Sequence, residues 1–426
     1  MGVSFVSLLL GLITGVHPVT VAVSGPVAAV ELRLDGQTAG SLHGEPWTVR
    51  CDFGGALRPH KLEAIATASD GRTLGTAVQW VNLPRQPAEV SLSLEAQPNG
   101  APTAVRVSWE SLEFTNPKRI EATLDGEPIE ASPSRIELPR RLAASTHFLT
   151  VRLVFPRGVV ATAELAFGGP IGEEVAAELT AVPIVLERDE ELPAAEAMSD
   201  WFTAVGQPLR VVAVERGFGE VVIVRDFSVG NLKGRWRGQL GGGALASGDV
   251  ARLLLPGASA ETRPGGTVFL FDLSRGYPGS EVGIPWMLAS LEPDAGVGKR
   301  QSLADAVCVA GIHAAESNAG RAVVLVLGRG SDDRSTHSVA TARDYLRELR
   351  VPLVVWTVEE HDDPATAAWL TGPEHSPVLS YGQLARAVRA LRGLLRSQAI
   401  VWVAGRHLPQ DIALAKPGLS ARLAGS

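Results

Sequence analysis

Apolar and polar residues alternate along short stretches in the first 168 positions, and turn residues separate these stretches. Residues 19–23, 30–34, 62–66 and 149–153 are examples. A period of two, with turn signals about every eight to twelve positions, is typical of an antiparallel sandwich. We therefore predict an all-β region at the start of the chain.

The same β-type pattern occurs twice. Val30-Glu-Leu-Arg-Leu-Asp-Gly36 returns as Ile120-Glu-Ala-Thr-Leu-Asp-Gly126, and a histidine that opens an alternating strand follows each copy, at His60 and His147. A repeat of this kind predicts tandem modules. We expect one sandwich over 17–86, a linker near 84–87 and a second sandwich over 88–169. Both histidines are interpreted as strand-edge residues rather than ligands.

The repeated modules resemble bacterial immunoglobulin-like domains. In that family a strand with an Asp-Gly turn precedes a strand of the form H-x-L-x-A-x-A, as in His60-Lys-Leu-Glu-Ala-Ile-Ala66. The second copy matches more loosely. The resemblance implies spacer or binding modules.

Beyond residue 217, continuous apolar runs alternate with segments of helical spacing. The runs at 220–224, 267–271, 322–327 and 351–356 are rich in β-branched residues, and Leu384, Val388, Leu391 and Leu395 mark one face of a helix. This alternation predicts a mostly parallel, doubly wound α/β sheet over 219–410. Residues 172–218 are predicted to be a connector with one or two strands, and 411–426 a tail.

Asp226 and Ser228 follow the first strand of this predicted sheet. Ligands of such sheets bind beyond the carboxyl ends of the strands, and Mg²⁺ prefers carboxylate, hydroxyl and water oxygens. One Asp and one Ser supply too few ligands, so other loops would have to add more. Asp272 and Ser274 repeat the D-x-S form and are a rival position for the first strand, but they leave too few residues before the helix that starts near 301.

Residues 206 to about 410 resemble a von Willebrand factor type A domain of the divergent bacterial, secreted group. The segments that carry the resemblance are Asp226-Phe-Ser-Val-Gly230, Gly248-Asp-Val250, Gln301-Ser-Leu-Ala-Asp305 and the strand that ends at Gly328-Arg-Gly330. They take the places of the family's D-x-S-x-S strand, second strand, helix start and T-D-G strand. The closing segment at 369–402 also looks like that of the family.

The resemblance implies a metal-ion-dependent adhesion site that is degenerate here. Asp226 and Ser228 are retained, whereas Gly230, Gln301 and Arg329 stand where the family has serine, threonine and aspartate. A guanidinium at the last position would repel a cation and could pair with Asp226 instead. We therefore expect no cofactor, with Mg²⁺, Mn²⁺ or Ca²⁺ as the alternative. The predicted partner-binding rim comprises Gly230, Gln301, Ser302, Arg329, Asp332 and Asp333. We interpret the acidic loops at 331–334 and 359–363 as solvated loops or as additions to that rim.

Charge and motifs exclude several classes of function. A net charge of −7 and a pI near 5.8 argue against nucleic-acid binding, which needs clustered excess Lys and Arg. No phosphate-binding loop, nucleophile elbow or metal-type Cys/His spacing occurs. Cys51 and Cys308 are predicted to be buried free thiols. The sequence predicts neither catalytic residues nor a small-molecule cofactor, so a hydrolase is the least favoured interpretation.

Residues 1–16 contain an uncharged apolar run, Val3 to Val16, of the length of a secretory h-region. We predict a signal peptide; an uncleaved membrane anchor, a buried first strand or a start codon placed too far downstream are the alternatives. Export implies a secreted, periplasmic or cell-envelope location. The leading hypothesis is a non-enzymatic adhesion-type protein whose α/β domain docks a protein partner, and the alternative is a metal-free scaffold of the cell envelope.

Overall fold

The computed structural model divides the chain into two compact units. The larger unit holds residues 1–84, 181–403 and 407–426, and the smaller unit holds 85–180 and 404–406. The structure describes residues 2–7, 9, 11–84, 88–96, 102–111, 116–124, 127–132, 134–139, 147–156, 160–167, 175–176, 179–186, 192–198, 200–230, 232, 244–263, 266–279, 283–290, 301–316, 320–329, 333–359, 364–371, 375–415 and 421–425.

The first sandwich lies in the larger unit and pairs its strands in the orders β1-β2-β5 and β4-β3-β6-β7. The strands are β1 (Gly2–Phe5), β2 (Val16–Ser24), β3 (Ala29–Leu34), β4 (Gln37–Leu42), β5 (Thr48–Asp52), β6 (His60–Thr67) and β7 (Thr73–Val81). The predicted Asp-Gly turn is confirmed, because Asp35 and Gly36 join β3 to β4 with φ of 51° and 78°. Positive φ at both residues suits a two-residue hairpin.

The apolar run at the N-terminus contributes to this sandwich. β1 pairs antiparallel with β2, and Leu9 and Ile13 lie in the same core as Val19, Leu32 and Leu62. The sandwich therefore includes residues before the predicted start at position 17. An apolar segment of this length fits a buried strand as well as a secretory h-region, so the signal peptide stays a prediction.

The smaller unit is the second sandwich. Its strands pair in the orders β12-β9-β8 and β11-β10-β13-β14-β15 around one apolar core. They are β8 (Ala88–Ala96), β9 (Pro102–Ser111), β10 (Arg119–Leu124), β11 (Glu127–Ile129), β12 (Arg135–Glu137), β13 (His147–Val154), β14 (Val160–Phe167) and β15 (Val175–Ala176). His147 opens β13 and is buried beside the ring of Phe167. The second predicted Asp-Gly turn lies outside the described residues.

The predicted connector and tail form two sheets together with β27, a strand from the end of the predicted α/β domain. Strands pair in the orders β19-β27-β16-β29 and β18-β17-β28, and they enclose a core that contains Met198, Trp201 and Phe202. The elements are β16 (Leu179–Leu186), η2 (Ala195–Met198), β17 (Phe202–Ala204), β18 (Gln207–Pro208), β19 (Val211–Glu215), β27 (Gln398–Ala404), η4 (Pro409–Asp411), β28 (Ile412–Leu414) and β29 (Ala421–Leu423). The connector has more strands than the one or two expected, and the tail is not separate, because these distant segments share backbone pairing. Its strands do pack on the last domain, as expected, since β19 pairs with β27.

The α/β sheet has the order β22-β21-β20-β24-β25-β26, with β23 paired to β21. Its strands are β20 (Gly219–Arg225), β21 (Val250–Arg263), β22 (Gly266–Leu273), β23 (Tyr277–Pro278), β24 (Gly320–Leu327), β25 (Leu353–Thr357) and β26 (His375–Pro377). β20 is parallel to β21 and β24, and the parallel pairing continues through β25 to β26. β22 is antiparallel to β21. The predicted mostly parallel sheet is thus present in the structure.

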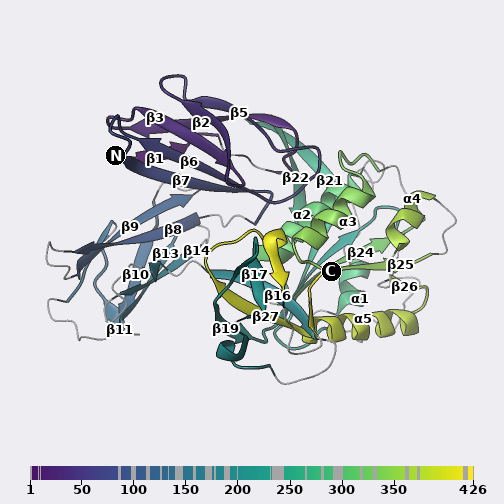
Figure 1. Ribbon diagram of the computed structural model, residues 1–426. Helices are drawn as coiled ribbons and strands as arrows, with labels where there is room; N and C mark the ends of the chain where they lie inside the picture. The colour runs from purple at the N-terminus through teal and green to yellow at the C-terminus, as the bar shows by residue number, and fades with distance from the viewer. Residues whose placement is uncertain are drawn as a thin grey trace. The chain divides into compact units, whose positions relative to one another are not determined.

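Helices cover both faces of this sheet, as Figure 1 shows for α2 and α5. The helices are α1 (Ile284–Ser290), α2 (Leu303–Glu316), α3 (Val339–Glu348), α4 (Pro364–Ala367), η3 (Ala368–Leu370) and α5 (Tyr381–Arg396). Val221 and Ile223 of β20 lie in a core with α1 and α5, whereas Val222 and Val224 lie in a core with α2 and α3. Successive strand residues point to opposite faces, so a continuous apolar run serves both layers.

Cys51 and Cys308 are free and buried, as predicted. Burial raises the pKa of the Cys308 thiol well above its usual value.

Of the helices in the described part of the chain, none combines the length and apolar character that crossing a membrane requires.

Candidate functional site

The carboxyl ends of β20, β24 and β25 lie along one edge of the α/β sheet, because these strands are parallel. Asp226 follows β20, Gly328 and Arg329 follow β24, and Glu359 comes two residues after β25. The loop that ends at Gln301 and opens α2 reaches the same edge, since Gln301 contacts Asp226. Asp226, Gln301 and Arg329 therefore lie at one edge of the sheet, the edge at which the sequence predicts the site.

Asp226 is 1% exposed and accepts hydrogen bonds from protein donors at both carboxylate oxygens. Oδ1 accepts from the Ser228 backbone N–H at 2.8 Å, and Oδ2 accepts from the Ser228 hydroxyl at 2.7 Å and the Gly328 N–H at 3.3 Å. A buried carboxylate requires such donors because its desolvation is costly. Ser228 thus donates to Asp226.

Gly328 permits this close approach of two loops. A Cβ at Gly328 would lie 2.4 Å from the carbonyl carbon and from the hydroxyl oxygen of Ser228. No side chain fits at that distance from backbone, so the position requires glycine. The requirement is a consequence of the distance between the loops after β20 and β24.

Gln301 supplies the decisive contact of the site. It is 3% exposed, its Nε2 donates to Asp226 Oδ1 at 2.9 Å, and its Oε1 accepts from the Phe227 N–H at 3.0 Å. The Phe227 N–H needs an acceptor, which fixes the orientation of the amide and turns its nitrogen toward the carboxylate. A cation would require an oxygen ligand at this place.

The residues do not fit the metal site that the resemblance implies. Donors of Gln301 and Ser228 face Asp226, and Gly230 offers only backbone, whose carbonyl accepts from Arg225 at 3.3 Å. Within the described residues, the structure shows no group of three or more His, Cys, Asp or Glu side chains that could hold a metal ion. No mechanistic step is therefore assigned to a cation.

Arg329 does not pair with Asp226, so that hypothesis is wrong. Its side chain is 83% exposed, and Nε lies 2.5 Å from Oε2 of Glu359 in the loop after β25. The reason is the direction of the chain: Gly328 is held against the Ser228 loop, and the following residue points away to solvent. Arg329 and Glu359 form a charged pair on the rim, of which the arginine is exposed and the glutamate is mostly buried.

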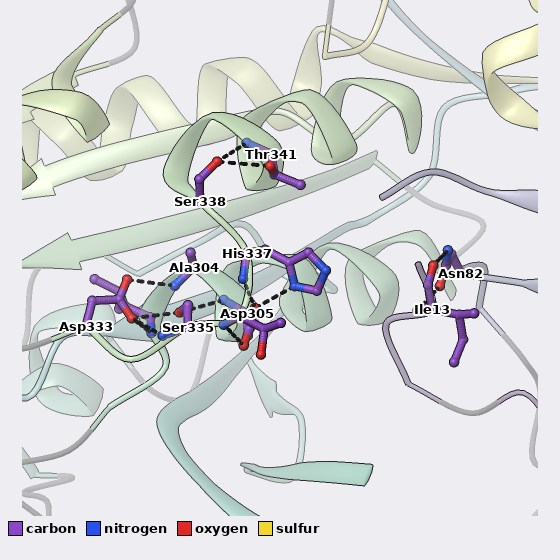
Figure 2. Close-up of polar contacts among 11 residues, drawn as sticks. Ile13, Asn82, Ala304, Asp305, Asp333, Ser335, His337, Ser338 and Thr341 are labelled. Atoms are coloured by element: carbon purple, nitrogen blue, oxygen red, sulfur yellow. Dashed lines mark hydrogen bonds and ion pairs between the residues drawn. The ribbon is translucent and has the colours of Figure 1, made fainter. Parts of the chain in front are cut away.

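Asp333 caps the start of α2 instead of contributing a metal ligand. Its carboxylate accepts from the backbone N–H groups of Leu303 at 2.8 Å and Ala304 at 3.3 Å, and from the N–H and hydroxyl of Ser335 (Figure 2). The first N–H groups of a helix lack partners within the helix and favour a negative charge. This loop is further joined to Gln301 by a backbone bridge.

Asp305 and His337 hold the other side of the same loop, and the sequence interpretation did not select them. His337 Nδ1 lies 2.7 Å from Asp305 Oδ1, and the carboxylate also accepts from the N–H groups of Thr336 and His337 (Figure 2). Burial by itself would raise the pKa of Asp305, but the hydrogen bonds from His337 and the backbone hold that pKa below its usual value. An acidic residue in the first turn of a predicted helix was the available signal.

The remaining predicted residues lie in several places. The Ser302 N–H donates to the Pro256 carbonyl at 2.8 Å at the start of α2. Asp272 lies in the antiparallel edge strand β22, and Ser274 bonds to backbone groups of Leu253 and Arg275. Asp332 lies outside the described residues, as does most of the 359–363 acidic loop. Arg225, buried beneath the first loop, donates to its carbonyls and was also missed.

Comparison with known proteins gives no family assignment. No protein-family model matches the chain, and no curated protein matches it. The chain is similar to solved structures of Clostridium thermocellum CbhA fibronectin(III)-like modules (16% identity, 39% of this chain and 93% of that chain, TM-score 0.17). It is also similar to the central fibronectin-III array of RIM-binding protein (12% identity, 46% and 80%, TM-score 0.26) and to Parabacteroides merdae β-glucuronidase (14% identity, 36% and 22%, TM-score 0.17). At these TM-scores the likenesses carry no argument about fold or function.

Proposed function

We propose that this chain is an exported, non-enzymatic docking protein whose α/β domain, of the von Willebrand A type, binds a protein partner at its loop rim without a metal ion. The immunoglobulin-like sandwiches act as spacers in this proposal. The observation that carries it is the Gln301 carboxamide, which donates to Asp226 where a cation-dependent site needs an oxygen ligand.

The strand order supports the type A assignment. A parallel sheet with β20 between β21 and β24, an antiparallel edge strand β22 and helices on both faces is the arrangement that the family resemblance implies. Function does not follow from a fold, so the assignment of docking depends on the rim. There, the loops after β20 and β24 are held by buried hydrogen bonds, whereas Arg329 is exposed.

A rigid rim with an exposed arginine suits recognition of a protein surface. Asp333 fixes the 333–338 loop to α2, and the Asp305–His337 pair fixes its other end. Groups held in place before binding lose little conformational entropy when a partner arrives. The exposed Arg329 offers a positive charge to that partner, which favours specificity and a fast association rate, whereas Glu359 is only 18% exposed.

The first test is thermal unfolding of the full chain with Mg²⁺, Mn²⁺ or Ca²⁺ and with a chelator. Ligand at about a hundred times its Kd would add about 2.7 kcal/mol, a shift of several degrees. We expect no shift for the wild type. A shift that the Asp226→Asn variant abolishes would replace the proposal with cation-dependent adhesion.

The second part of the test concerns docking itself. The immobilised full chain is incubated with an extract of the cells that produce it. We expect it to retain one envelope protein, and to retain that protein equally well in chelator and in Mg²⁺. Arg329→Glu should abolish that retention, whereas Arg72→Glu, a matched charge reversal on an exposed turn of the first sandwich, should leave it unchanged. Equal retention by both variants would remove the rim from the proposal.

A further inference from the structure

Helix α5 presents a row of arginines to solvent. Its apolar side is buried in the core that it shares with α1, and its outer side carries Arg386, Arg389, Arg392 and Arg396. Arg392 is half-buried, and the other three arginines are exposed. Residues three or four positions apart are neighbours on a helix surface, so the four guanidinium groups form one row about 15 Å long.

No acidic side chain neutralises this row in the described part of the chain. The sequence of α5 contains neither Asp nor Glu, and none of its four arginines forms an ion pair with a described residue. Helix α3, on the other face of the sheet, differs in this respect. There Arg347 pairs with Asp344 at 2.8 Å, and Arg343 donates to the Trp369 carbonyl. The outer side of α5 is therefore a positive surface on a chain whose net charge is −7.

The residues between the arginines are small. They are Gly382, Ala385, Ala390 and Gly393. Because none of them projects beyond the long arginine side chains, a flat surface can reach the whole row. A row of guanidinium groups offers paired N–H donors that match the oxygens of phosphate groups.

An exposed tryptophan lies on the same side of the sheet. Trp286 of α1 is 44% exposed, and it is the only exposed Trp among the side chains that the structure describes. α1 and α5 cover the same face of the sheet (Figure 1), and Met287 and Leu288 of α1 lie in one core with Leu391 of α5. Trp286 therefore points away from the sheet to the side on which the arginines are exposed. Tryptophan favours the boundary between lipid headgroups and acyl chains.

We propose that the α5 face, which comprises Trp286, Arg386, Arg389, Arg392 and Arg396, binds the surface of a bilayer that contains anionic phospholipids. The arginines contact headgroup phosphates, and the Trp286 ring enters the interfacial layer. A chain of net charge −7 is repelled by such a surface as a whole, so binding requires this face to be turned toward it. The inference goes beyond the proposed function and does not rest on it, because the rim lies at the carboxyl edge of the sheet and not on this helical layer.

The test is sedimentation of the full chain with vesicles of phosphatidylglycerol and phosphatidylcholine in equal parts, and with vesicles of phosphatidylcholine alone. We expect the chain to bind the anionic vesicles and not the neutral ones. Binding should be lost at about 1 M salt, where the Debye length is only about 3 Å. A chain that binds neither kind of vesicle, or both equally, would overturn the proposal.

Paired variants locate the binding surface. Each basic residue near an anionic surface strengthens binding about fivefold, so Arg386→Gln/Arg389→Gln should weaken binding to the anionic vesicles about 25-fold. The control Arg72→Gln/Arg347→Gln removes the same charge from two exposed arginines outside α5 and should bind as the wild type does. Unfolding in urea should be alike in both double variants, because all four side chains are exposed. Equal losses of binding would show that only the net charge matters, and the α5 face would then be wrong.

Trp286→Ala distinguishes a bilayer from an acidic protein. A bilayer has an interfacial layer for the indole ring, whereas polyglutamate offers only negative charge. We expect this variant to bind the anionic vesicles more weakly than the wild type and to match the wild type on polyglutamate. Vesicle binding that Trp286→Ala leaves unchanged, together with tight binding of polyglutamate, would replace the bilayer with an acidic protein as the partner of this face.

Discussion

Asp226 and Glu348 each place a carboxyl oxygen in the interior of the same unit, but the two carboxyl groups differ in the hydrogen-bond donors that surround them. Asp226 accepts from Ser228, Gly328 and Gln301, two of which lie more than seventy residues away in sequence. Glu348 Oε2 has no hydrogen-bond partner among the described residues. Protein donors thus occupy both oxygens of the first carboxylate, whereas Oε2 of the second accepts from none of the described donors. The supply of donors, and not burial alone, decides what a buried carboxyl group can bind.

The largest change in the free energy of unfolding is expected for Asp226→Ala, the carboxylate with the most donors. The change leaves the Gln301 amide and the N–H groups of Ser228 and Gly328 buried without their acceptor. Hydrogen bonds to a charged group contribute about 1.5–3 kcal/mol each, so we expect a loss of roughly 3 kcal/mol or more in the free energy of unfolding, measured in urea. Ser228→Ala, which removes one donor, should cost about 1 kcal/mol. Equal losses for both variants would contradict the assigned network.

An intermediate effect on the free energy of unfolding is expected for Asp305→Asn, and this effect should depend on pH. The pKa of Asp305 lies below its usual 3.8 in the folded chain, so its ionised form stabilises the fold above about pH 4, and that contribution disappears as the pH falls through the folded-state pKa. Relative to the wild type, Asp305→Asn should be less stable above about pH 4, and the difference should shrink as the pH falls through the folded-state pKa of Asp305. The measurement is chemical unfolding across that range, with Asp344→Asn as an exposed control. A difference that is constant with pH would show that the Asp305 carboxylate does not act through its charge.

The sequence predicted most of the architecture because the periods differ between regions. Alternation of period two indicated the sandwiches, and the continuous runs at 220–224 and 322–327 indicated strands buried on both faces. The same runs placed Asp226 at the correct edge. The sheet that contains β16, β27 and β29 was not predictable in this way, because it depends on pairing between segments more than two hundred residues apart.

The details of the site depend on the orientation of individual side chains, which cannot be inferred from the spacing of residues in the sequence. Gln301 was placed near Asp226, but which end of its amide would face the carboxylate depends on the Phe227 N–H. Asp333 was selected as an acidic rim residue, whereas its role follows from unpaired N–H groups at the start of α2. An alternation pattern contains no information on such contacts.

The smallest effect on stability is expected for Arg329→Ala. This variant tests an exposed residue of the rim, whereas Asp226→Ala tests a buried one. A side chain that is 83% exposed pairs with Glu359 in high dielectric, where such pairs contribute about 0–1 kcal/mol. We expect the free energy of unfolding to change by less than about 0.5 kcal/mol. Pairing of Arg329 with the buried Asp226 would instead make Arg329→Ala nearly as damaging as Asp226→Ala, because it would leave a charge buried without its partner. A near-neutral result therefore assigns Arg329 to the surface, where it is available to a partner, and leaves Gln301 and the loop donors to hold Asp226.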